Sequence, residues 1–229
     1  MSRIIRFGFC MFFSLLFSFS AYGQEFFVNA DIVSSYIWRG MKLGDISIQP
    51  TMGVTVGGFS AYAWGSTDFH ENNSEIDIYL EYEYKGLKVG IADYFMQEGD
   101  RPSYFDYKAH TTYHTFDFII GYTISEKFPL SFEWSTAFAG SDYKENEKRA
   151  YSSYLEIGYP FSIKGFDLRG EIGFTPWEGM YADKFNVTNV GLSITREIKI
   201  TDKFSLPISG KLIANPFEEQ VYFVFGLSL

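Results

Sequence analysis

Hydrophobic and polar residues alternate one by one along much of the chain, and residues 74–96 show this pattern most clearly. From residue 75 to residue 84 the even positions carry Ile, Leu and Tyr, whereas four of the five odd positions carry Glu or Asp. Successive side chains of a strand point to opposite faces, so the pattern predicts a strand with one apolar and one acidic face. Lys85 and Gly86 then predict a tight turn into a second strand.

The same alternation recurs in twelve runs. Short connections, such as 57–58 and 85–86, alternate with longer ones, such as 97–111 and 140–149. An even number of strands of about 10 residues with alternating short and long connections is typical of bacterial outer-membrane barrels. We therefore predict an all-β fold, a transmembrane antiparallel up-and-down β-barrel of about 12 strands, with the last strand paired to the first. The predicted strands are 28–39, 46–57, 59–69, 74–84, 87–96, 112–124, 130–139, 151–159, 166–175, 185–197, 204–214 and 220–229.

The N-terminal residues predict an export signal. Arg3 and Arg6 precede an apolar stretch over 7–19, and Ala21-Tyr22-Gly23 forms a cleavage site of the small-x-small type. A transmembrane helix is the alternative, but the stretch is shorter than the roughly 18 residues that such a helix needs. The sequence therefore predicts a signal peptide at 1–23, a single barrel domain at 24–229, and location in the outer membrane.

Composition narrows the set of partners. Aromatic residues make up 20% of the chain although the mean hydropathy is only −0.06, as expected when lipid-facing residues alternate with polar ones. The net charge is −9, and it becomes −11 when Arg3 and Arg6 leave with the signal. Such acidity argues against a nucleic-acid partner. The predicted partners are outer-membrane lipid and small solutes or ions, and the oligomeric state stays open.

The inward faces of the predicted strands are strongly acidic, with ten acids against the four bases Arg39, Lys88, Arg169 and Lys211. One interpretation is a set of ion pairs between neighbouring strands. The other is a narrow pore that favours small cations or neutral solutes, because 12 strands lie between the filled barrels of about eight and the open porins of 16 to 18. The predicted pore-lining residues are Arg39, Asp77, Glu81, Glu133, Glu156, Arg169, Glu171 and Lys211.

Catalysis has little support in the sequence. The Gly-x-Ser-x-Gly motif is missing, and His70, His110 and His114 fall in or beside predicted loops. We predict no enzymatic activity, no cofactor and no metal site. The alternatives are a plugged barrel that serves as a structural or surface-interaction protein, a membrane-embedded hydrolase, and a soluble β-barrel. The loop over 97–111 is expected either to fold inward as a constriction, to contact a ligand, or merely to cap the barrel.

Residues 35–40 (Ser-Tyr-Ile-Trp-Arg-Gly), 58–66 (Gly-Phe-Ser-Ala-Tyr-Ala-Trp-Gly-Ser) and 75–79 (Glu-Ile-Asp-Ile-Tyr) carry a resemblance to a known family. They resemble the TorF-type porins of Gram-negative bacteria over residues 28–95. The resemblance implies an outer-membrane location and a channel role. Trp38 stands where the family often has Phe, and we expect it to face the outside of the wall. Arg39 is expected at the rim, where its guanidinium would pair with Asp68 or Glu75.

Overall fold

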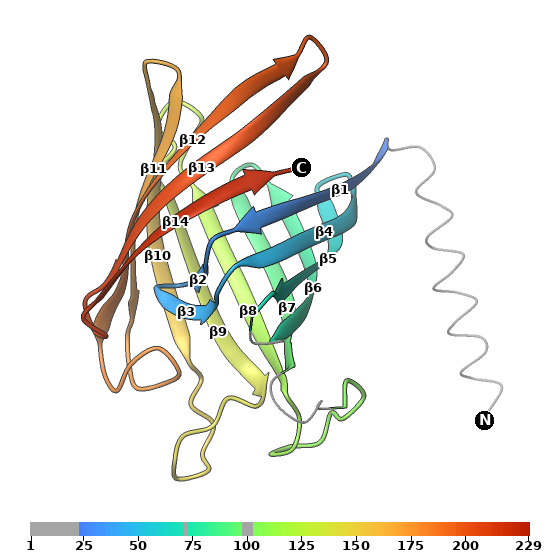
Figure 1. Ribbon diagram of the computed structural model, residues 1–229. Helices are drawn as coiled ribbons and strands as arrows, with labels where there is room; N and C mark the ends of the chain where they lie inside the picture. The colour runs from blue at the N-terminus through green and yellow to red at the C-terminus, as the bar shows by residue number, and fades with distance from the viewer. Residues whose placement is uncertain (1–22, 71–72, 98–102) are drawn as a thin grey trace, which may run out of the picture.

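A computed structural model describes residues 23–70, 73–97 and 103–229. Twelve of its strands form one closed antiparallel barrel, which confirms the predicted fold, and β2 and β3 pair only with each other (Figure 1). The predicted signal peptide lies outside the described residues except for Gly23. The strands are β1 (Gln24–Val33), β2 (Tyr36–Trp38), β3 (Met41–Gly44), β4 (Ser47–Val56), β5 (Phe59–Asp68), β6 (Ser74–Tyr84), β7 (Leu87–Gln97), β8 (His114–Thr123), β9 (Ser131–Gly140), β10 (Ser153–Ile163), β11 (Phe166–Thr175), β12 (Asn186–Thr201), β13 (Phe204–Asn215) and β14 (Gln220–Ser228).

The barrel closes between its first and last strands, as the sequence predicted. β1 and β14 pair in an antiparallel register with Asp31 opposite Ser228, and the Ser228 hydroxyl donates a hydrogen bond to Asp31 Oδ1 at 2.6 Å. β1 also pairs directly with β4, because the β2–β3 hairpin has left the wall. Every barrel strand therefore has a neighbour on both sides.

The two ends of the barrel differ in their connections. At one end, which we call the turn end, four two-residue turns and the short connection 124–130 join consecutive strands, and both the start of β1 and the C-terminus lie there (Figure 1). At the other end, the loop end, longer segments join β7 to β8, β9 to β10 and β11 to β12. This arrangement matches the predicted alternation of short and long connections.

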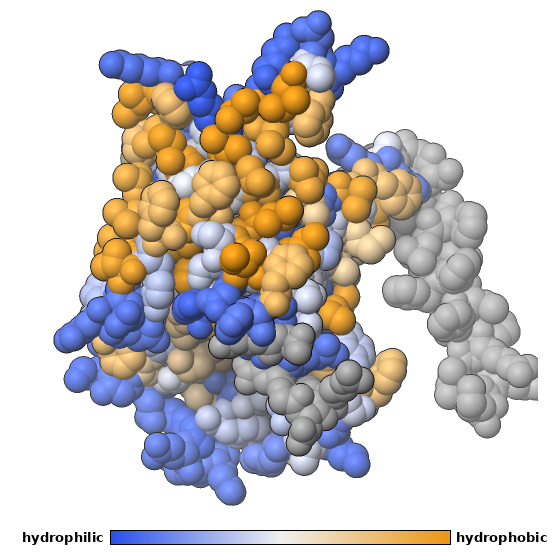
Figure 2. All heavy atoms as spheres, in the orientation of Figure 1, coloured by the Kyte–Doolittle hydropathy of each residue, from blue (hydrophilic) through white to orange (hydrophobic). Residues whose placement is uncertain are grey.

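The outer surface carries a broad apolar band with polar residues above and below it (Figure 2). On β6 the even-numbered side chains point outward, and Leu80 is 40% exposed, whereas inward-pointing Asp77 is only 2% exposed. Val221, Phe223 and Phe225 repeat this outward face on β14. The predicted division of these strands into an apolar outer face and a polar inner face is confirmed.

The prediction of one wall strand over 28–39 is wrong. β1 ends at Val33, and the chain then turns into the barrel as the β2–β3 hairpin (Figure 1). Trp38 therefore does not face outward as predicted. It packs inside against Tyr94, at 5.5 Å between ring centroids, and belongs to a small cluster with buried Ala92 and Ile119.

Two turns are shorter than predicted, because they occupy only the last two residues of the expected ranges, 164–165 and 202–203. β10 continues through Pro160 to Ile163, where a turn over 160–165 was expected, and β12 continues to Thr201, where a turn over 198–203 was expected. Both strands project further at the turn end than their hydrophobic runs indicate. Pairing explains the extension, since Pro160 lies opposite Arg169 and Ile198 opposite Leu206 in continuous ladders.

Candidate functional site

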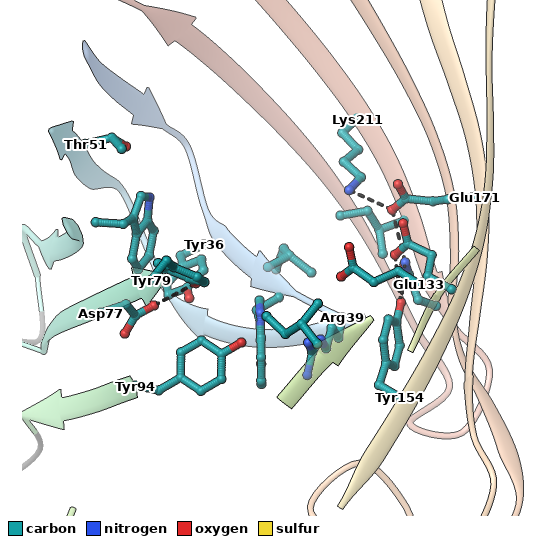
Figure 3. Close-up of a pocket in the computed structure, with 18 of the residues that line it drawn as sticks. Tyr36, Arg39, Thr51, Asp77, Tyr79, Tyr94, Glu133, Tyr154, Glu171 and Lys211 are labelled. Carbon is teal, nitrogen blue, oxygen red and sulfur yellow. Dashed lines mark hydrogen bonds and ion pairs between the residues drawn. The ribbon is translucent and has the colours of Figure 1, made fainter. Parts of the chain in front are cut away.

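The main hollow inside the barrel, here called the lumen chamber, has a volume of about 480 Å³. Figure 3 shows its two sides, with Tyr36, Asp77, Tyr79 and Tyr94 on one side and a charged group that includes Glu171 and Lys211 on the other. A second hollow of about 260 Å³ shares Lys88, Glu133 and Glu156 with the chamber. The two hollows therefore meet at these shared side chains.

The structure gathers the predicted pore-lining residues inside the barrel. Arg169 lines the second hollow. The other seven, which line the lumen chamber, are Arg39, Asp77, Glu81, Glu133, Glu156, Glu171 and Lys211. Their part in conduction stays a prediction, because lining a chamber does not by itself establish a path through it.

Ion pairs connect one side of the chamber. Lys88 Nζ lies 2.6 Å from Glu133 Oε2 and 3.9 Å from Glu81 Oε1. β7 supplies Lys88, whereas β9 and β6 supply the two acids. The ammonium group thus joins strands on both of its sides, as expected of pairs that stabilise a sheet.

A second ion-pair network lies on β10, β11 and β13. Arg169 Nη2 is 3.0 Å from Glu156 Oε1, and Arg169 Nε is 3.6 Å from Glu171 Oε2. Lys211 Nζ approaches the other Glu171 oxygen at 2.7 Å, and the Asn189 amide donates to that same oxygen at 3.0 Å. Most charges of this wall are therefore held against opposite charges, which supports the interpretation of the acidic interior as paired.

Aromatic rings form the opposite wall. Tyr62 of β5 stacks on Tyr79 of β6, with centroids 4.6 Å apart and an interplanar angle of 10°. The Tyr79 hydroxyl donates to Asp77 Oδ2 and the Tyr62 hydroxyl to Glu81 Oε2, both at 3.2 Å. Trp64 adds a further ring on β5. Here the carboxylates accept hydrogen bonds from phenols rather than from bases.

Arg39 closes the loop-end side of the chamber. Its guanidinium lies 3.3 Å from Asp117 Oδ2 and donates a hydrogen bond to the Tyr181 hydroxyl. The same group lies over the rings of Trp38 and Tyr154, at 4.4 and 4.9 Å from their centroids. We call these five residues the Arg39 plug. With 8% of its side chain exposed, Arg39 is sealed in rather than placed at the rim.

The predicted acid partners of Arg39 are therefore wrong. Its carboxylate partner is Asp117 on β8. Asp68 instead accepts hydrogen bonds from the backbone N–H groups of Asp45 and His70, both at 2.5 Å. The correction follows from the hairpin, because turning into the lumen carries Arg39 across the barrel and away from β5.

The β2–β3 hairpin is fixed at its base and at its tip. At the base, the Ser35 hydroxyl donates to the Gly44 carbonyl at 3.0 Å. At the tip, Gly40 has a φ of +86°, and a Cβ there would lie 1.8 Å from the Thr188 carbonyl oxygen. The buried Asn215 amide donates to the Gly40 carbonyl at 3.2 Å. The hairpin tip is thus held against β12 and β13, which lie two to three strands from β1 in the barrel.

The described part of the loop over 97–111 does not enter the lumen. Its Tyr104 carbonyl oxygen lies 2.7 Å from His114 Nε2, and Tyr107 stacks on the same imidazole. His114 alternates in register with outward-pointing Phe118 of β8, and its Nδ1 lies 2.7 Å from Asp93 Oδ1. Residues 103–111 therefore pack against the outside of the barrel, and the segment that enters the lumen is the β2–β3 hairpin.

Two kinds of feature are absent from the part of the chain that the structure describes. There, His, Cys, Asp and Glu side chains form no group of three or more able to hold a metal ion. No helix in the same residues combines the length and apolar character needed to cross a membrane.

Comparison with known families gives one match. Residues 19–207 match the model of a family described as bacterial protein of unknown function (Gcw_chp). The chain belongs to the Gcw_chp family. No curated protein matches the sequence. The predicted membership of the TorF-type porins is not established by this match and stays a prediction.

The sequence predicted the charged residues that line the chamber. It did not predict the aromatic wall or the Arg39 plug. Inward-pointing tyrosines such as Tyr62 and Tyr79 alternate in phase with the acids, so strand parity was a usable signal for them. Tyr181 lies in the loop between β11 and β12 and contacts Arg39 across 142 residues of sequence. No local pattern indicates that contact.

Proposed function

We propose that this Gcw_chp protein is an outer-membrane β-barrel that acts as a narrow passive channel for small solutes, with the Arg39 plug as its constriction. The observation that carries the proposal is a closed barrel, apolar outside, whose polar chamber is crossed by a hairpin that holds Arg39 against side chains of the wall.

The arrangement of the barrel ends supports an outer-membrane location. Outer-membrane barrels place short turns in the periplasm and longer loops outside the cell. Here both barrel termini lie at the turn end, which we assign to the periplasm (Figure 1). The Arg39 plug includes Tyr181 from the β11–β12 loop at the loop end, which we assign to the external side. The predicted export signal is consistent with this orientation.

The chamber lining favours small cations or neutral solutes over anions. Five acids line it, whereas its bases are Arg39, Lys88 and Lys211. Because most of these acids are ion-paired, the excess of negative charge is small. We therefore expect only a weak preference for cations, and we propose no catalytic step.

Single-channel recording tests the proposal. The refolded protein is placed in a planar bilayer under a salt gradient, beside a variant in which residues 35–45 are replaced by a Gly-Ser linker. A matched control replaces residues 144–148, in a loop between β9 and β10, by the same type of linker. We expect small discrete steps from the natural protein and the control, and steps several-fold larger from the hairpin variant. A folded hairpin variant that stays silent would overturn the proposal.

The number of contacts that hold Arg39 in place favours a second function. In this alternative the barrel is plugged and serves as a structural or surface-interaction protein. Arg39 is satisfied by a carboxylate, a hydroxyl and two ring faces, so opening must break several contacts together. This function predicts that only the hairpin variant conducts, and that the natural protein stays closed at every voltage applied.

A further inference from the structure

The two walls of the lumen chamber differ in chemistry. Tyr62, Trp64 and Tyr79 bring aromatic rings to one side. The other side presents paired charges, with Glu171 held between Lys211 and Arg169. A solute in the chamber would therefore meet ring surfaces on one face and fixed hydrogen-bonding groups on the other (Figure 3).

The pairing of the charges disfavours an ionic solute. A cation would have to compete with Lys211 for Glu171, and an anion would have to displace Glu171 from Lys211 and Arg169. Separating a charge pair in a confined site costs free energy that the new pair must recover. A neutral hydroxyl can donate to an already paired carboxylate, or accept from an ammonium group, without breaking the pair.

The aromatic wall selects for an apolar surface on the same solute. Stacked or tilted rings bind flat or weakly polar faces, and a wholly polar molecule gains little from them. The Tyr62 and Tyr79 hydroxyls remain hydrogen-bond acceptors while they donate to Glu81 and Asp77. A volume of about 480 Å³ falls in the range of roughly 300–1,000 Å³ that small-molecule sites have.

We propose that the lumen chamber binds a neutral, hydroxyl-rich solute with an apolar ring face, which in chemical class is a mono- or disaccharide. The C–H face of the sugar ring packs on Tyr62, Trp64 or Tyr79. Its hydroxyls bond to the paired groups around Glu133, Glu156 and Glu171. The assignment rests on the proposed function, because a solute reaches this site only through the lumen.

Tryptophan fluorescence provides a direct binding test on the full-length mature protein refolded in detergent micelles. Trp38 and Trp64 line the chamber and report on its contents. The titrants are glucose, maltose, and two charged glucose analogues that keep the pyranose ring, namely glucosamine, below the pKa of its amine, and glucuronate. We expect saturable binding of glucose and maltose, with the two charged analogues at least about tenfold weaker. Equal or tighter binding of a charged analogue, or no saturable binding of either sugar, would overturn the proposal.

Two tyrosines, Tyr62 inside the chamber and Tyr82 on the outer face, allow a matched comparison of variants. Tyr62→Ala removes a chamber ring and should weaken maltose binding by about tenfold, whereas Tyr62→Phe keeps the ring and should retain most of the affinity. Tyr82→Ala removes an outward ring that is 49% exposed and should leave binding unchanged. Equal loss in Tyr62→Ala and Tyr82→Ala would show that the chamber is not the site. If Tyr62→Ala does not fold, the comparison of glucose with its charged analogues on the natural protein decides the question.

Binding and conduction together separate this inference from the proposed function. A barrel that conducts salt and binds neither sugar overturns the saccharide assignment alone. A barrel that binds maltose and never conducts, with or without residues 35–45, overturns the channel and keeps the chamber as a saccharide site.

Discussion

The β6–β7 hairpin and the segment from β1 to β3 begin with the same alternation of apolar and polar residues, yet they end in different places. β6 and β7 pair along their whole length, from Ser74 opposite Gln97 to Tyr84 opposite Leu87, and both stay in the wall. β1 stays in the wall only as far as Val33, and the chain then folds into the lumen.

The difference lies in the partners that each segment finds. Ser34 makes the last hydrogen bonds that this segment forms with the neighbouring strand β14, which join its N–H and hydroxyl to the backbone of Phe225, both at 2.9 Å. Beyond it, β2 pairs only with β3, while Trp38 and Arg39 bury themselves among side chains from β7, β8 and β10. Alternation thus predicts a strand, but the neighbours decide whether that strand belongs to the barrel.

The largest effect should come from breaking the contacts that hold the hairpin inside. Arg39→Ala leaves Asp117 buried without its ion-pair partner, and removing one member of a buried pair typically costs about 3–5 kcal/mol. We expect a loss of this size in the free energy of unfolding, measured by urea titration in lipid vesicles, together with larger conductance steps. The double variant Arg39→Ala/Asp117→Asn should recover part of the lost free energy of unfolding, because Asp117 no longer carries an unpaired charge. Its conductance steps should stay as large as those of Arg39→Ala. Unchanged unfolding and conductance in Arg39→Ala would show that the ion pair has no role.

A charge on the outer face of the wall should have the next largest effect. Leu80 lies near the middle of β6 and points outward, so in the proposed outer-membrane barrel Leu80→Arg places a cation against lipid, at a cost of about 2–4 kcal/mol. Ile37→Arg makes the same kind of change on the hairpin, at a position that lines the polar chamber. We expect its cost in the same vesicle titration to be clearly smaller. Equal costs would contradict the assignment of the two segments to wall and lumen.

Glycine substitutions compare the hairpin tip with a wall turn. Gly40 and Gly86 both have positive φ, and a Cβ at Gly86 would lie 2.4 Å from the Thr123 carbonyl oxygen. Forcing alanine into this conformation costs about 1–2 kcal/mol. We expect Gly40→Ala and Gly86→Ala both to lower the free energy of unfolding, but only Gly40→Ala to increase conductance. Increased conductance in both variants would contradict the separate role of the hairpin.

The smallest effect concerns pH at the loop end. The Thr111 hydroxyl and the Lys108 amide donate to Asp106, and they hold the pKa of this carboxyl below its usual range. A lowered pKa contributes stability above the unfolded value, about 3.9, and that contribution is lost as the pH falls through the folded value. We expect a lower protection factor against amide hydrogen exchange at Lys108 at such low pH, after correction for the intrinsic exchange rate, with no change in conductance. Thr111→Val should weaken this pH dependence, and an unchanged profile would show that the contact is unimportant.

Strand parity was enough to predict most of the interior. Asp77, Glu81, Glu133 and Glu171 face the lumen as their positions in alternating runs require, and the pairing of the last strand with the first follows from the need to remove sheet edges. The alternation of side chains along a strand did not show which basic residue forms an ion pair with which acidic residue. The contact between Lys88 and Glu133, for example, depends on the register across two strand pairs.

The sequence by itself determined the all-β class, the strand number of the barrel, and which faces are apolar, because these depend on a period of two residues that is visible locally. Only the tertiary structure decided the fate of residues 34–45. Trp38 and Arg39 reach their partners Tyr94 and Asp117 across the barrel, and such contacts exist only once the wall has closed around them. The physical reason is that alternation specifies a strand with one apolar and one polar face. Entry into the lumen depends instead on the carboxylate and aromatic side chains that line it.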